Sequence, residues 1–196
     1  LLSLTVQTLW LEIVTLSCLV WFGGFVSIIM HPRISAMYRS HWFVASLGWI
    51  LLLSAWFGLL TLVQVENGRL WVFWLFLLTT ATDVGAFFLG RAFGQYALAP
   101  QISPGKTREG AGGGLVLALV VCVPMLFLSG ALDFYASIGL TIVMSIVSIF
   151  GDLFESLLKR VSGIKDSGAL LPGHGGLLDR IDSIIAVVPF LAWSVC

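Results

Sequence analysis

The stretch IVMSIVSIFGDLFESLLKR, residues 142–160, decides how this chain can fold. An apolar run interrupted only by small residues leads directly into a segment rich in acidic and basic side chains. Nine of the twenty charged residues of the whole chain lie between Asp152 and Asp182. Because the segments on both sides of this region are as apolar as lipid, we expect membrane helices that meet at a charged site.

The composition of the full chain excludes a water-soluble domain. Its 196 residues are 59% hydrophobic and 10% charged, with a mean hydropathy of +1.03, whereas ordinary globular proteins carry roughly 25% charged residues. The formal net charge is zero, which gives no electrostatic basis for binding nucleic acid. Cys18, Cys122 and Cys196 stand singly in apolar runs and are expected to be buried hydrophobes rather than disulfides or zinc ligands.

Six apolar segments approach or exceed the ~20 residues that span a bilayer. They are Leu4–Met30, Trp42–Val65, Leu70–Gly90, Ala111–Leu132, Phe134–Leu158 and Ile181 to the end. We therefore predict an all-α fold, a polytopic integral membrane bundle with about six transmembrane helices. No basic leader precedes the first segment, and the chain stops inside an apolar run, so we expect it to be part of a longer protein.

Positive charge is distributed unevenly over the predicted connections. Nine of the ten Lys and Arg residues fall in connections that six spans would place on one side of the membrane, and only Arg69 lies opposite. The positive-inside rule places that side in the cytoplasm. The three basic connections are residues 31–41, 91–110 and 159–180.

Carboxylates within the apolar segments are informative because an ionised acid in hydrocarbon is costly unless it is paired, hydrated or bound to metal. At 1.5 Å per helical residue, Asp83 lies roughly 10 Å and Asp152 about 12 Å from the basic ends of their spans. Asp152, Glu155, Ser156 and Lys159 follow a spacing of i, i+3, i+4 and i+7, which places them on one helix face.

Asp179 and Asp182, at the start of the last span, bring the number of carboxylates that can converge at this face to five. Mg²⁺ favours a few carboxylates together with substrate phosphates, so a magnesium site is one interpretation of this group. The alternative is a set of structural ion pairs in which Lys159, Lys165 and Arg180 neutralise the acids.

Two glycine-containing loops lie in the same basic connections. SPGKT, residues 103–107, is not a Walker A motif because Pro100 stands where glycine is required. Lys106, Thr107 and Arg108 can still bind phosphate oxygens, or alternatively anionic lipid headgroups.

The second loop is PGHGG, residues 172–176, where glycines allow close backbone approach and His174 can donate a proton. Acids for a divalent metal beside cations for phosphates are typical of phosphoryl or nucleotidyl transfer. The membrane setting suggests that one substrate is a lipid.

Two blocks of the chain resemble a known family. Residues 156–182 contain S-x-x-K-R-x4-K-D-x-G-x3-P-x-H-G-G-x-x-D-R-x-D, which is similar to the signature of the phosphatidate cytidylyltransferases (CDP-diacylglycerol synthases). Residues 82–110, TDVGAFFLGRAFGQYALAPQISPGKTREG, resemble a second block of that family. The chain departs from the second block at Val84, where serine is usual, and at Gln101, where lysine is common.

The resemblance implies Mg²⁺-dependent transfer of CMP from CTP to phosphatidate, giving CDP-diacylglycerol and pyrophosphate for phospholipid biosynthesis. The metal ligands that it implies are Asp152 and Asp179 first, then Asp182 and Asp83. The implied catalytic residues are Lys159, Arg160, Lys165, Asp166, His174 and Arg180. The implied substrate contacts are Ser103, Lys106, Thr107, Arg108, Ser156, Gly175 and Gly176.

The same resemblance implies the setting of the protein. Residues 1–196 would form one transmembrane domain, with N-terminal spans at 1–81 and a catalytic part at 82–196. We expect a multi-pass protein of the bacterial plasma membrane with its active site facing the cytoplasm. Its partners would be CTP, phosphatidate and the bilayer, without nucleic acid, and a homodimer is an open alternative to a monomer.

Two other functions stay open at this point. A relative could use CTP to modify another membrane lipid, such as a polyprenyl or ether lipid, and the sequence does not distinguish the acceptors. An ion-coupled transporter would place its acids near the bilayer midplane within repeated halves, and neither feature is visible here. A CDP-alcohol phosphotransferase would need a DxxDG run, which the chain lacks.

Overall fold

The computed structural model describes residues 2–30, 38, 40–164, 167–168 and 176–196, with side chains from residue 12 onward. Within these residues the chain forms six helices, which confirms the predicted all-α bundle. The helices are α1 (Leu2–Ile29), α2 (His41–Gln64), α3 (Gly68–Phe93), α4 (Arg108–Leu128), α5 (Phe134–Val161) and α6 (Leu178–Val195).

Five helices, α1 to α5, are long and apolar enough to cross a membrane. The last, α6, is 18 residues long and carries Asp179, Arg180 and Asp182 in its first turns. Only 183–195 is apolar, a length of roughly 20 Å. Buried side chains such as Ala186 and Leu191, both 0% exposed, fix α6 inside the bundle. The polytopic membrane architecture is therefore confirmed, with α6 as an inner helix.

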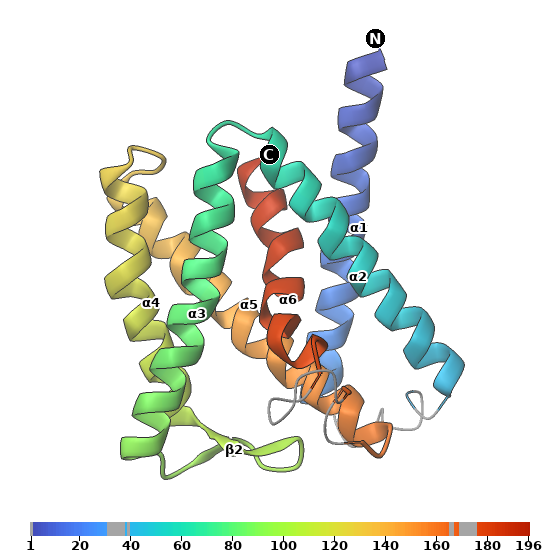
Figure 1. Ribbon diagram of the computed structural model, residues 1–196, viewed down its shortest axis with the longest axis vertical. Coiled ribbons are helices and arrows are strands. Elements are labelled where there is room, and N and C mark those ends of the chain that lie inside the picture. The colour runs from blue at the N-terminus through green and yellow to red at the C-terminus, as the bar shows by residue number, and fades with distance from the viewer. Residues whose placement is uncertain (1, 31–37, 39, 165–166, 169–175) are drawn as a thin grey trace.

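The helices run alternately up and down, so that both ends of the chain lie at the same end of the molecule (Figure 1). The opposite end contains the end of α1, the start of α2, the connection between α3 and α4, the end of α5 and the start of α6 (Figure 1). These are the helix ends that flank the three basic connections. The alternation predicted from the sequence therefore matches the arrangement of the helices.

The connection between α3 and α4, which we expected to be a glycine-containing loop, contains a small hairpin. Strand β1 (Ala97–Ala99) pairs antiparallel with β2 (Ser103–Thr107), with Ala97 opposite Thr107 and Ala99 opposite Ser103. The strands are too short to form a core of their own, so their position depends on contacts with the helices.

Two side chains fix the hairpin to the start of α4. Oε2 of Glu109 accepts hydrogen bonds from the backbone N–H groups of Gln95, at 3.2 Å, and Tyr96, at 3.3 Å. Oγ1 of Thr107 accepts from the N–H of Gly110 at 3.1 Å, which makes Thr107 the N-cap of α4. The chain therefore passes from β2 into α4 without a free linker.

Glycines allow α3 and α4 to approach each other closely. A Cβ atom added to Gly114 would lie 2.5 Å from the carbonyl oxygen of Thr82, and one added to Gly85 would lie 2.6 Å from the carbonyl oxygen of Gly113. The GxxxG spacing of residues 110–114 is typical of such close helix packing. This contact holds the part of α3 that carries Asp83 against α4.

We predict that Gly114→Ala lowers the stability of the bundle, by about 1–3 kcal/mol, because the helices must separate to admit the methyl group. Gly112→Ala is the matched control, since no described atom lies within 4 Å of its added Cβ. Alanine improves helix propensity at both positions, so the control is expected to melt no lower than wild type. Thermal unfolding of the purified protein in detergent measures both, and equal melting temperatures would contradict the close contact.

Candidate functional site

Three carboxylates lie together where α5 meets α6. Asp152 and Glu155 come from adjacent turns of α5, and Asp182 comes from the second turn of α6. Each offers one oxygen, and these oxygens all lie within 4.8 Å of one another. We call these three residues the acid group. The approach of α6 depends on Gly151, because a Cβ atom there would collide with the Cβ of Ala186.

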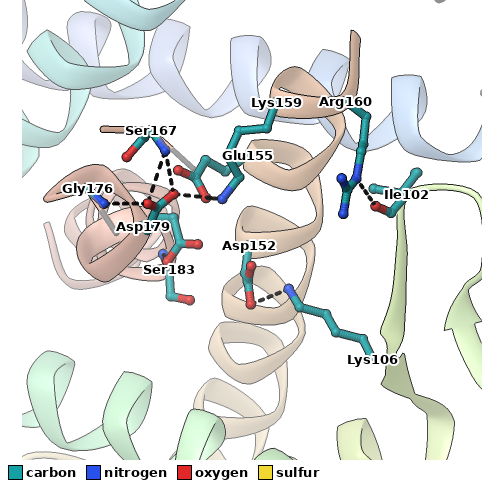
Figure 2. Close-up of polar contacts among 11 residues, drawn as sticks. Ile102, Lys106, Asp152, Glu155, Lys159, Arg160, Ser167, Gly176, Asp179 and Ser183 are labelled. Carbon is teal, nitrogen blue, oxygen red and sulfur yellow. Dashed lines mark hydrogen bonds and ion pairs between the residues drawn. The ribbon is translucent and has the colours of Figure 1, made fainter. Parts of the chain in front are cut away.

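The acid group is partly paired within the protein. Nζ of Lys106, carried by β2, forms an ion pair with Oδ2 of Asp152 (Figure 2). The two side chains are 28% and 30% exposed, but Nζ of Lys106 is itself buried, so the exposed part of this lysine is its hydrocarbon stem. Oε1 of Glu155 is buried and has no hydrogen-bond partner among the described residues. Within the part of the chain that the structure describes, the group thus has one buried carboxylate oxygen that no nitrogen donor contacts.

Lys159 bridges the acid group and Asp179. Its Nζ lies 2.7 Å from Oε2 of Glu155 and 2.8 Å from Oδ1 of Asp179 (Figure 2). Asp179 is thereby held beside the acid group, with a lysine between them. Its Oδ2 also accepts from the backbone N–H of Gly176 at 2.7 Å and of Ser167 at 3.1 Å.

These contacts keep Asp179 ionised. Asp179 lies in the first turn of α6, before the apolar part of that helix begins. Burial alone would raise the pKa of its carboxyl, but the hydrogen bonds from Lys159, Gly176 and Ser167 outweigh it and hold this pKa below its usual range. Asp179 is therefore a stable anionic partner that orders the start of α6 and fixes Lys159.

Arg160 fastens the hairpin to α5. Its Nε donates a hydrogen bond of 3.2 Å to the backbone carbonyl oxygen of Ile102, in the turn between β1 and β2 (Figure 2). The side chain of Ile102 is 4% exposed, so the turn is also held by packing. Together with the Lys106–Asp152 ion pair, this gives the hairpin two attachments on α5, about two helical turns apart.

A pocket of about 420 Å³ opens between α3, the hairpin, α4 and α5. Its volume is within the usual range for small-molecule sites. Asp83 lines it together with Asp152, so the two acids that we expected at matching depths do share one pocket. Arg91, Lys106 and Thr107 provide polar and cationic groups around it. We call it the polar pocket.

The other residues predicted for the site divide into two sets. Ser156 follows Glu155 on α5, Gly176 donates to Asp179, and Ser103 begins β2. Arg108 and Arg180 are exposed at the starts of α4 and α6. The residues predicted for the site that lie outside the described residues are Lys165, Asp166, His174 and Gly175.

The roles of three residues in the site were not predicted from the sequence. Glu155 was expected on the right face but not ranked as a metal ligand, although its i, i+3 spacing from Asp152 was a sufficient signal. Glu109 and the carbonyl of Ile102 act by holding the hairpin. A backbone carbonyl leaves no signal in the side-chain pattern, so that contact needed the structure.

The architecture is thus a multi-pass membrane bundle with a charged site beside a pocket of about 420 Å³. The chain matches the model of the cytidylyltransferase family over residues 1–195. It therefore belongs to the cytidylyltransferase family, which confirms the resemblance seen in its motifs.

Several curated relatives are similar to this chain. The phosphatidate cytidylyltransferase of Pseudomonas aeruginosa is 42% identical over 183 residues, covering 91% of this chain and 67% of the relative. That of Haemophilus influenzae is 46% identical over 132 residues, which cover 65% of this chain and 46% of the relative. That of Staphylococcus haemolyticus is 47% identical over 130 residues, which cover 64% of this chain and 49% of the relative. The chain spans about half the length of the latter two relatives.

We predict that Arg160→Gln loosens the hairpin without unfolding the bundle, because it removes one of the two attachments on α5. Amide hydrogen exchange of residues 97–107 should become at least about 5-fold faster, as expected for a lost hydrogen bond to a charged donor. Arg69→Gln, an exposed residue at the opposite end, is the control. Unchanged exchange in the hairpin would show that the contact with Ile102 does not hold it.

Proposed function

We propose that this chain carries the active site of a phosphatidate cytidylyltransferase, which transfers CMP from CTP to phosphatidate and releases pyrophosphate. The observation that supports it best is the meeting of three carboxylates with Lys106 and Lys159 at one end of a membrane bundle of this family. The names of the relatives support the same reaction. The lipid product would be CDP-diacylglycerol.

Mg²⁺ fits the acid group. Hard divalent cations prefer carboxylate oxygens, and the free, buried Oε1 of Glu155 is a ready ligand beside Asp152 and Asp182. Lys106 and Lys159 balance two of the four carboxylates once Asp179 is counted, so a divalent ion matches the formal charge of the other two. When bound, Mg²⁺ would reduce the negative charge of the phosphates during transfer.

The protein's own residues would bind and orient the two substrates. Lys106, Arg91 and Thr107 surround the polar pocket and suit the triphosphate of CTP. Lys106 would exchange its partner, from Asp152 to a phosphate oxygen, when the nucleotide enters. Arg160 would then act by keeping the hairpin, and so Lys106, over the pocket.

The reaction needs little proton transfer. A phosphate oxygen of phosphatidate attacks the α-phosphorus of CTP, and the bond from that phosphorus to the bridging oxygen of the β-phosphate breaks. Pyrophosphate leaves with the electron pair of that bond. The attacking phosphate is already ionised at neutral pH, so the site has to provide positioning and charge rather than a general base.

The basic end of the bundle would face the cytoplasm of a bacterial cell. The support is the positive-inside rule, since nine of the ten basic residues lie in the three stretches of sequence predicted as basic connections, residues 31–41, 91–110 and 159–180. CTP would then reach the polar pocket from the aqueous side, and phosphatidate would come from the inner leaflet.

We predict that Asp152→Asn reduces pyrophosphate release from CTP and phosphatidate by at least about 100-fold, since a lost metal ligand removes several kcal/mol of charge stabilisation. Glu155→Gln should reduce it similarly. Asp133→Asn is the matched control, because Asp133 caps α5 at the other end and asparagine caps a helix equally well. Full turnover by both acid-group variants would refute the proposed site.

We predict opposite labelling of two single-cysteine variants in a background without Cys18, Cys122 and Cys196. Gly105→Cys in the hairpin should react with a membrane-impermeant maleimide only after the cells are opened. Glu66→Cys, an exposed position at the opposite end, should react in intact cells. The reverse pattern would place the acid group outside the cytoplasm.

A further inference from the structure

Most of the surface of the polar pocket is apolar, although its cations suit phosphates. Ala86 and Phe87 on α3, Leu98 on β1 and Ile149 on α5 contribute to this apolar surface. Phosphates bind to cations and N–H groups and do not need such walls, whereas the base and the ribose of a nucleotide do. The part of the pocket away from the cations is therefore suited to a nucleoside.

Asp83 is the charged group that α3 adds to these apolar walls. It is exposed, lines the polar pocket, and forms no hydrogen bond or ion pair with another described residue. It is not a member of the acid group, whose oxygens come from α5 and α6. Small-molecule pockets use a few such polar groups among apolar walls to orient a ligand. Its carboxylate is therefore available to a molecule in the pocket.

One face of α3 presents an acid, an aromatic ring and a cation in order. Asp83, Phe87 and Arg91 follow a spacing of i, i+4 and i+8, and all three line the pocket. The first and the last are about 12 Å apart along the helix axis. This order matches a nucleotide that lies along α3 with its phosphates toward Arg91 and its base toward Asp83.

Phe87 offers a surface for stacking. Its ring is 59% exposed and packs edge-on against Phe88, with centroids 5.5 Å apart. Stacking on an aromatic ring stabilises every base, because each base has a flat face. Phe87 therefore does not distinguish one base from another, and any discrimination has to come from Asp83.

The backbone that carries Asp83 is fixed on both sides. A Cβ atom added to Gly85 would lie 2.6 Å from the carbonyl oxygen of Gly113, and the carbonyl oxygen of Thr82 packs equally closely against Gly114. Specificity requires a polar group that does not move to suit the wrong ligand. The contact between α3 and α4 meets this requirement.

We propose that Asp83 determines the base specificity of the polar pocket by accepting a hydrogen bond from the exocyclic amino group of cytosine. The inference rests on the proposed function. An ionised carboxylate accepts hydrogen bonds and cannot donate them, and carboxylates accept from this amino group when proteins read cytosine. Uracil has a carbonyl oxygen at the same position, which the carboxylate repels. The pocket therefore favours CTP over UTP.

This role differs from that of a metal ligand, which the family resemblance implied for Asp83. A metal ligand acts on the triphosphate, which is the same in CTP and UTP, so its loss weakens both nucleotides equally. A base contact changes the ratio of the two affinities. The ratio therefore distinguishes the two roles.

The first experiment measures nucleotide binding by the full chain in nanodiscs that contain no phosphatidate, by displacement of radiolabelled CTP in the presence of Mg²⁺. Wild type should bind CTP about 10- to 100-fold more tightly than UTP. Asp83→Asn should reduce this preference to about 3-fold or less, because an amide both accepts and donates. Asp133→Asn, at the other end of α5, is the matched control and should keep the wild-type ratio. An unchanged ratio in Asp83→Asn overturns the proposal.

A nucleotide without the amino group isolates the contact. The analogue is CTP with hydrogen in place of the amino group at C4 of the base. Asp83→Ala should weaken CTP binding at least about 10-fold, as for a hydrogen bond to a charged group, and leave the affinity for the analogue unchanged. Equal losses for both nucleotides, in a variant that melts like wild type, overturn the proposal.

Metal binding without nucleotide gives an independent readout. Mn²⁺ binding followed by electron paramagnetic resonance should weaken at least about 10-fold in Asp152→Asn and stay unchanged in Asp83→Asn. Equal weakening in both variants would identify Asp83 as a metal ligand and overturn the proposal.

Added phosphatidate separates this inference from the proposed reaction. If wild type prefers CTP through Asp83 but transfers no CMP to phosphatidate, the reaction is refuted and the base contact stands. If wild type transfers CMP and Asp83→Asn keeps the full preference for CTP, the inference alone fails.

Discussion

The structure depends on bringing several carboxylates together at one end of a membrane bundle. Four acids from α5 and α6 lie within reach of two lysines, and such a group is costly in a protein interior unless cations compensate it. Lys159 provides part of this compensation within the helices. Lys106 provides a second positive charge from the hairpin, so the position of a short surface element affects the charge balance of the acid group.

That dependence explains why the contacts around the hairpin are so specific. Glu109 and Thr107 join it to α4, Arg160 holds its turn, and Lys106 pairs with α5. Two short strands without a core of their own would not otherwise hold a lysine in a fixed place. The glycine contact between α3 and α4 also helps to position the hairpin, because it fixes the two helices from which the hairpin extends.

The sequence predicted the helices well because lipid leaves the backbone few alternatives, and the length of each apolar run then defines a span. It also predicted that Asp152 and Glu155 share a face, since helical periodicity is local information. It did not predict that Lys159 separates Asp179 from the acid group, nor that Arg160 binds a backbone carbonyl. Those contacts depend on how two helices rotate and on a hairpin turn, which residue spacing does not encode.

The acid group lies between the polar pocket and a smaller apolar pocket, of about 100 Å³, that is lined by α1, α2, α5 and α6. Anionic groups are stabilised by nearby cations, whereas hydrocarbon is stable among apolar side chains. One helix, α5, lies between the two pockets, with Asp152 in the lining of the first and the buried Glu155 beside the second. Because neighbouring turns of a helix point in slightly different directions, an i, i+3 pair of acids can border both pockets within 4.8 Å.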